Sequence, residues 1–259
     1  MDEARIRNLA ELRGVLAAAP EFSHMSRGER FFVFPIETRR LSGAADRINV
    51  VARQSLLEAA PVQEAQSVHI TGELRSFNNK RGEGAKLVIT VFARGIVFDG
   101  GEDINRVALS GTLCKAPNLR VTPMGRDICD LMLAVNRRCG RSDYLPCICW
   151  GRRAREAALL GVGDRLELSG RIQSRPYIKL IDGQPVEKTA YEVSVTDMEA
   201  VSPCVRGRSA GGGGLAGRNS PFCCCVSLPC AAYPPHFFGL AQRNGVEPQR
   251  KALGVVAPP

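Results

Sequence analysis

Arginine and aromatic side chains alternate along residues 136–177, and this combination could bind a nucleic acid. Guanidinium groups neutralise the phosphates of a nucleic-acid chain, and flat rings stack on unpaired bases whatever the base is. The sequence therefore predicts a surface for a single nucleic-acid strand. The side chains that would form it in this stretch are Arg137, Arg138, Arg141, Tyr144, Trp150, Arg152, Arg171, Arg175 and Tyr177.

The distribution of charge favours the same surface. The chain has 259 residues and a formal net charge of +9. Basic residues exceed acidic ones only slightly over residues 1–100 (14 against 12) and 101–200 (15 against 13), so the global excess lies mostly after residue 200 (6 against 1). Residues 106–155, however, contain ten basic and three acidic side chains. This local excess, more than the overall charge, indicates an electrostatic footprint for nucleic acid.

An internal repeat organises the chain. The matched segments are residues 8–20 with 105–117 (offset 105 − 8 = 97), residues 39–40 with 137–138 (offset 98), and residues 68–74 with 166–172 (offset 98). So regular a period indicates a tandem duplication of one fold. We expect a first repeat over residues 1–103, a second repeat over residues 104–201, and a disordered tail rich in Gly, Pro and Cys over residues 202–259.

Each repeat is predicted to be mainly β. In the second repeat, alternating apolar residues indicate three strands, a breaker-free helix over residues 152–160, and two further strands, with glycine kinks in the first and fourth strands. The first repeat shows the same order. This order is typical of a small Greek-key barrel of the OB type. The expected fold is therefore mainly β, with two tandem five-stranded OB-fold barrels that each carry a short helix.

The second repeat closely resembles the bacterial single-stranded DNA-binding proteins over residues 104–201. The motifs that carry the resemblance are Asn105-x-Val107-x-Leu109-x-Gly111-x-Leu113, the segment from Pro117 to Gly125, Leu133-Ala134-Val135-Asn136-Arg137-Arg138, Trp150-Gly151-Arg152, and the segment from Leu168 to Tyr177. Two such units in one chain resemble the tandem-repeat members of that family, which assemble as homodimers presenting four OB units.

The resemblance implies sequence-independent binding and protection of single-stranded DNA in replication, recombination and repair. It places Tyr144, Trp150 and Tyr177 where base-stacking rings lie. Strand alternation adds that Arg171 and Arg175 share the outward face with Tyr177. Phosphate contacts are expected from Arg120, Arg137, Arg138, Arg141, Arg152, Arg171 and Arg175. A competing interpretation places Trp150 in the core, and Arg153 and Arg155 are expected on a solvated helix face.

The first repeat departs from this pattern. Opposite the three rings and Arg171, an offset of 98 places Asp46, Ala52, Asn79 and Glu73. A carboxylate in place of a guanidinium repels phosphate. We therefore expect the first repeat to be a scaffold or dimerisation unit with weak DNA contact. In the second repeat, Cys139 stands at the family's other stacking position, where it cannot stack on a base.

No catalytic constellation, phosphate-cradling glycine loop or apolar run of about 20 residues is evident, so we expect a non-enzymatic cytoplasmic protein at the nucleoid, with no cofactor and no membrane partner. Cys129, Cys147 and Cys149 are expected to be buried small apolar residues, not metal ligands. Two alternatives remain open. One is an OB adaptor for replication or recombination proteins with weak DNA contact. The other is a zinc site formed by Cys223, Cys224, Cys225, Cys230 and His236 in the tail, with an enzymatic activity.

The family usually ends in an acidic tail with a short apolar tip that recruits partner enzymes. The last 59 residues of this chain contain one acidic residue. The resemblance therefore leaves the recruitment of replication and repair proteins open.

Overall fold

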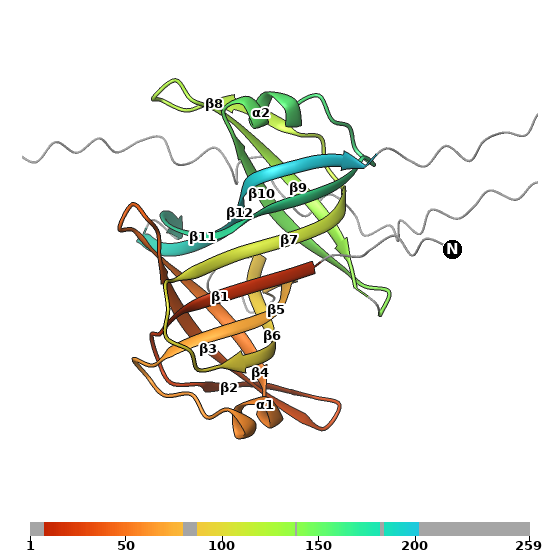
Figure 1. Cartoon of the computed structure of the whole chain (residues 1–259). Helices are drawn as coiled ribbons and strands as arrows, with labels where there is room; N and C mark the ends of the chain where they lie inside the picture. Colours follow the sequence, from red (N-terminus) through yellow and green to blue (C-terminus); the bar gives the residue numbers. More distant parts are fainter. Residues whose placement is uncertain (1–7, 80–86, 138, 182–183, 202–259) are drawn as a thin grey trace, which may run out of the picture. The chain divides into compact units, whose positions relative to one another are not determined.

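The computed structural model describes residues 8–79, 87–137, 139–181 and 184–201 (Figure 1). The expected disordered tail and its alternative zinc site lie outside these residues. The described chain is mainly β, with two short helices, and its strands form one continuous sheet that folds into two barrels. The two barrels belong to one compact unit.

The first barrel is built from the segment between residues 8 and 97. Its elements are β1 (Asn8–Leu16), β2 (Glu21–Ser26), β3 (Glu29–Arg39), β4 (Ala45–Arg53), α1 (Gln54–Ala59), β5 (Ser67–Asn78) and β6 (Leu87–Val97). The second barrel repeats this order after residue 103. Its elements are β7 (Ile104–Leu113), β8 (Asn118–Val121), β9 (Asp127–Asn136), β10 (Ser142–Trp150), α2 (Arg152–Ala157), β11 (Arg165–Ile181) and β12 (Gln184–Val201).

Two strand pairings close each barrel. In the first barrel, β1 pairs antiparallel with β3 at Leu16 and Ile36, and β4 runs parallel to β6 at Val50 and Val91. The second barrel closes through the equivalent pairings of β7 with β9 and of β10 with β12. This confirms the predicted pair of OB-type barrels. The short strands β2 and β8 were not predicted, because nearly all their side chains are exposed and so leave no apolar alternation.

Each barrel interior is filled by alternate side chains of its strands. Cys129, Cys147 and Cys149 lie among these buried residues, as predicted. Burial raises the pKa of the Cys129 thiol to about 11 and that of Cys149 to about 12, so these cysteines are thiols at neutral pH and pack as small apolar groups.

The barrels are joined edge to edge through their first strands. β1 and β7 pair antiparallel, with Ala10 opposite Val107. These two residues are equivalent in the repeats (107 − 10 = 97), so the junction is pseudo-symmetric about this pair. An asparagine amide flanks it in each barrel. The amide nitrogen of Leu74 donates to Asn8 Oδ1 at 2.8 Å, and that of Ile172 donates to Asn105 Oδ1 at 2.8 Å.

Glycines allow the strands to cross closely at the barrel corners. Gly14 and Gly111 are equivalent positions in β1 and β7, and Gly72 and Gly170 are equivalent in β5 and β11. A Cβ atom at any of these four would collide with a backbone oxygen of the crossing strand. At Gly111, it would lie 2.6 Å from the carbonyl oxygen of Ala134. The kinks predicted from the glycines are therefore close approaches of backbone.

Gly111→Ala should lower the free energy of unfolding by about 1–3 kcal/mol, because the added methyl group must displace backbone. Gly100→Ala is the matched control, since a Cβ there meets nothing within 4 Å. Urea unfolding followed by circular dichroism measures both variants. Equal stabilities would show that β7 can move away from β9 without cost.

Candidate nucleic-acid interface

The hairpin of β11 and β12 carries one half of the candidate surface. Its strands pair continuously from Arg165 opposite Val201 to Ile181 opposite Gln184, with a single register shift after Ser169. Leu166, Leu168 and Ile172 are buried in the core. The residues with the opposite parity are half-buried on the outward face, as predicted, and they are Arg171, Gln173, Arg175 and Tyr177. Burial raises the pKa of the Tyr177 hydroxyl, so this side chain is an uncharged ring.

The other half lies on β10. Leu145, Cys147 and Cys149 are in the core, and the residues of opposite parity form an outward set, within which Pro146 and Ile148 are shielded from solvent. Tyr144 and Trp150 belong to this outward set and are 40% and 39% exposed. Trp150 is therefore not a core residue, which excludes the competing interpretation.

The register of the sheet joins the two halves into one face. Across β10, β12 and β11, Ile148 lies opposite Ser194, and Ser194 lies opposite Arg171. These three residues share the outward parity, so the rings on β10 and the cations on β11 flank the same strip of sheet.

Two of the arginines predicted to bind phosphate are paired with buried carboxylates within the protein. Arg137 donates from Nε to Asp143 Oδ2 at 2.7 Å and from Nη2 to Oδ1 at 2.5 Å, and this hydrogen bonding raises the pKa of Arg137. Arg120 donates from Nε to Asp130 Oδ2 at 2.7 Å. Asp143 and Asp130 are buried, so each guanidinium compensates a buried charge.

The remaining predicted cations differ in exposure. Arg141 is exposed, and the Arg152 side chain is 83% exposed and lies 3.4 Å from Glu156. Arg171 and Arg175 are half-buried, and neither forms a salt bridge with a described residue. Arg138 lies outside the part of the chain that the structure describes.

A buried carboxylate lies near Arg175. Glu192, on β12, is 6% exposed and accepts a hydrogen bond from Gln173 Nε2 at 3.3 Å. Burial raises its pKa, although Arg175, Arg120 and Arg40 act in the opposite direction. Sequence reasoning did not single out Glu192. Its parity placed it on the outward face, but only the fold shows that this part of the face is shielded from solvent.

Strand pairing shows that equivalent residues of β4 and β10 are 97 positions apart in the chain, not 98 as expected from the sequence. On β4, Arg53 lies opposite Phe31, and on β10, Trp150 lies opposite Ile128. Because 128 − 31 and 150 − 53 both equal 97, Arg53 is the counterpart of Trp150. Asp46 correspondingly matches Asp143, and Arg47 matches Tyr144. The predicted matches of Tyr144 with Asp46 and of Trp150 with Ala52 were wrong, because the extra residue of the second repeat lies after β4, not before it.

The first barrel therefore has its own cluster of cations and rings. The guanidinium carbons of Arg53, Arg75 and Arg94 lie 5.7, 6.0 and 5.0 Å from the centroid of the Phe92 ring. Glu73 forms ion pairs with both Arg75 and Arg94 and so neutralises part of this charge. Finding this cluster from sequence would have required the corrected register and the position of Phe92 opposite Glu73.

Metal-binding clusters and membrane-spanning helices are both missing from the described segments. No group of three or more His, Cys, Asp or Glu side chains there is arranged to hold a metal ion. None of the helices in these segments has the length and apolarity needed to cross a membrane.

Two OB barrels with rings and arginines on one outward face define an OB-fold protein with a surface suited to single-stranded nucleic acid. The profile of the single-strand binding protein family matches residues 104–201. Single-stranded DNA-binding protein A of Bacillus subtilis (strain 168) is 36% identical over 123 residues, which are 45% of this chain and 67% of that protein. The chain belongs to the single-strand binding protein family.

A second relative agrees with this assignment, and a solved structure shares the fold. The single-stranded DNA-binding protein of Clostridium tetani is 38% identical over 81 residues, which are 29% of this chain and 56% of that protein. The match therefore spans little more than half of that relative. The crystal structure of the wild-type single-stranded DNA binding protein from Thermus aquaticus superposes with a TM-score of 0.63 at 24% identity, over 83% of this chain and 98% of that one. This last likeness concerns the fold.

Glu192→Gln should raise the free energy of unfolding at pH 7.5. A carboxyl group whose folded pKa lies above its unfolded value stabilises the fold only while it is protonated, and that contribution is lost as the pH rises through the folded pKa. The gain should therefore shrink towards pH 4.5, near the ordinary glutamate pKa of about 4.3. Urea unfolding at both pH values measures it, with the exposed Glu187→Gln as the control. An equal gain at the two pH values would contradict a raised pKa for Glu192 in the folded protein.

Proposed function

We propose that this chain binds single-stranded DNA without regard to sequence, and that it protects such DNA in replication, recombination and repair. The observation that carries the proposal is one outward side of the sheet, where the exposed Tyr144 and Trp150 on β10 and the half-buried Arg171 on β11 lie on either side of a strip that is itself shielded from solvent. Relatives in the same family are named single-stranded DNA-binding proteins, which supports it.

The proposed mechanism is non-catalytic. Tyr144, Trp150 and Tyr177 stack on unpaired bases, at about 1–3 kcal/mol for each base, and any base is accepted because every base has a π face. Arg141, Arg152, Arg171 and Arg175 neutralise phosphates. The affinity therefore falls as salt rises, because each phosphate contact releases counterions.

Arg120 and Arg137 act in this proposal mainly by holding the loops and strands around the face. Each is engaged by a buried aspartate, so a phosphate would have to compete with that carboxylate. The sequence-based expectation of a phosphate contact for Arg138 stays a prediction.

We further propose that residues 104–201 form the main DNA-binding unit and that residues 1–103 serve as scaffold and dimerisation unit, in a cytoplasmic homodimer with four barrels. Family membership supports the homodimer. The partial neutralisation of the first-barrel arginines by Glu73 supports weaker DNA contact there. The same observation favours the second candidate function, an OB adaptor that binds replication or recombination proteins. Quenching of Trp150 by oligo-dT distinguishes the two, because Trp150 is the one tryptophan of the chain.

Trp150→Ala and Tyr177→Ala should each weaken binding of a labelled oligo-dT by about 5- to 140-fold, which corresponds to the loss of one base stack. Fluorescence anisotropy of the labelled DNA measures the affinity of all variants. Leu159→Ala removes a side chain that is 88% exposed on the loop after α2 and should leave the affinity unchanged. Wild-type affinity in both ring variants would refute the stacking face.

Arg175→Gln should make the affinity less dependent on salt. Each phosphate contact on a single strand contributes about 0.7 to the slope of log K against log salt concentration, so the slope should become shallower by about that amount. Arg153→Gln is the matched control, since Arg153 lies on α2 and pairs at 3.4 Å with Asp197. An identical slope in wild type and Arg175→Gln would show that Arg175 does not contact a phosphate.

A further inference from the structure

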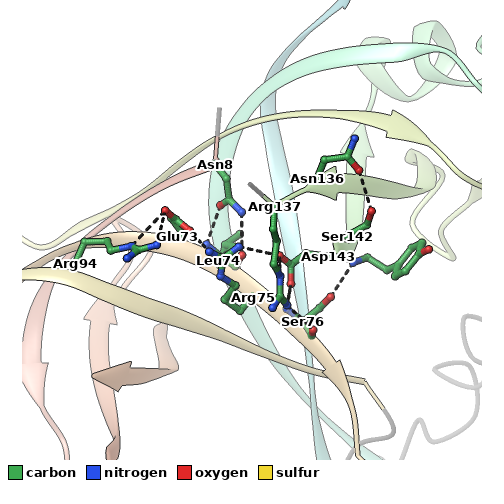
Figure 2. A network of polar contacts seen from close by, with 11 residues as sticks. Asn8, Glu73, Leu74, Arg75, Ser76, Arg94, Asn136, Arg137, Ser142 and Asp143 are labelled. Atoms are coloured by element: carbon green, nitrogen blue, oxygen red, sulfur yellow. Dashed lines mark hydrogen bonds and ion pairs between the residues drawn. The ribbon is translucent and has the colours of Figure 1, made fainter. Parts of the chain in front are cut away.

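Ser76 of the first barrel forms hydrogen bonds to the second barrel through its amide nitrogen, its carbonyl oxygen and its hydroxyl group. Its amide nitrogen donates to Asp143 Oδ1 at 2.6 Å, and its carbonyl oxygen accepts from Arg137 Nη2 at 3.3 Å (Figure 2). Its hydroxyl oxygen accepts a hydrogen bond from the amide nitrogen of Tyr144 at 2.7 Å. Ser76 is 8% exposed, so these bonds are protected from competing water.

The contact with Tyr144 occurs where β10 begins to carry the candidate DNA face. Within β10, Tyr144 lies opposite Ala134 of β9, and its side chain is exposed. Its backbone position is therefore set from two sides, by strand pairing within its own barrel and by a hydroxyl from the other barrel. The side chain is 40% exposed, so the direction of the ring depends strongly on this backbone.

An equivalent contact exists at the opposite junction, with the barrels exchanged. Ser174 of the second barrel donates from its amide nitrogen to Asp46 Oδ1 at 2.8 Å and accepts from the amide nitrogen of Arg47 at 3.1 Å. Arg47 is the counterpart of Tyr144, so the same hydrogen bond positions a ring at one junction and a cation at the other. The two contacts match in chemistry and differ in the residue that they position.

We propose that Ser76 is a positioning residue for single-stranded DNA binding: its hydroxyl, supplied by the first barrel, orients Tyr144 of the second barrel for base stacking. The inference rests on the proposed function. It assigns the first barrel a direct part in the second barrel's surface that is independent of any DNA contact of its own. Without the hydroxyl, the Tyr144 amide has no acceptor in a buried place, and the start of β10 must shift to satisfy it.

A double-mutant cycle in the full-length chain tests this role. Ser76→Ala should weaken oligo-dT binding by about threefold to tenfold, the range expected from one hydrogen bond. In a Tyr144→Ala background, the same substitution should change the affinity by less than about twofold, because the ring that Ser76 orients is absent. The slope of affinity against salt should stay at its wild-type value, since no charge is removed.

Three further variants make the test specific. Ser76→Thr keeps the hydroxyl and should restore most of the affinity. Ser174→Ala breaks the equivalent hydrogen bond to Arg47, and any effect that it has should be the same with and without the Tyr144 ring. Ser76→Cys, whose thiol is a weak acceptor, replaces the alanine variant in the cycle if that variant does not fold.

The outcomes separate this inference from the proposed function. If the wild-type chain does not bind oligo-dT, the proposed function fails. If Tyr144→Ala binds as tightly as wild type, Tyr144 does not stack on a base, and the positioning role is overturned while the test of Trp150 and Tyr177 still stands. If Tyr144→Ala weakens binding but Ser76→Ala does not, the positioning role is overturned. It is equally overturned if Ser76→Ala weakens binding by the same factor in both backgrounds, because the effect would then not pass through the ring.

Discussion

The structure depends on a buried aspartate at each junction of the two barrels. Asp143 is fully buried and accepts hydrogen bonds from Arg137, from Arg75 and from the amide of Ser76. A carboxylate without such partners would be costly to bury, and removing one partner of a buried ion pair typically costs about 3–5 kcal/mol. Because Arg75 and Ser76 come from the other barrel, Asp143 has its full set of hydrogen bonds only when the barrels are docked. Asp46 has the same role with Arg40 and Ser174.

This constraint explains why the two repeats keep some residues and vary others. The aspartates, the asparagines at the β1–β7 junction and the corner glycines occupy equivalent positions in both barrels, and each makes the same kind of contact in both. On the outward face the repeats differ at nearly every step. Arg53 occupies the position equivalent to Trp150, and Glu73 occupies the position equivalent to Arg171. The interior thus sets the shape of both barrels, and the outward face is free to give them different chemistry.

Most of the fold could be predicted because burial alternates along the strands and the repeat has a nearly constant period. The exposure of Trp150 followed from the same alternation, since its neighbour Cys149 is a core residue. The edge strands β2 and β8 could not be predicted, because exposed strands have no apolar alternation. The error of one residue between Asp46 and Tyr144 arose because the pairs Arg39–Arg40 and Arg137–Arg138 were matched by identity, whereas strand pairing aligns Arg40 with Arg137.

The candidate site was harder to predict than the fold, because a side chain's role depends on partners that are distant in sequence. The charge of Arg137 is not freely available for phosphate, because Asp143 engages its guanidinium and so does the carbonyl oxygen of Ser76, which is 61 residues away. Counting cations in a window therefore overestimates the charge that a ligand meets. Of the arginines predicted to bind phosphate, Arg141, Arg171 and Arg175 form no salt bridge with a described residue. Because the barrels dock pseudo-symmetrically, one long hairpin lies beside each junction. The contact that holds the barrels together therefore also holds the β11–β12 hairpin, which the DNA would meet.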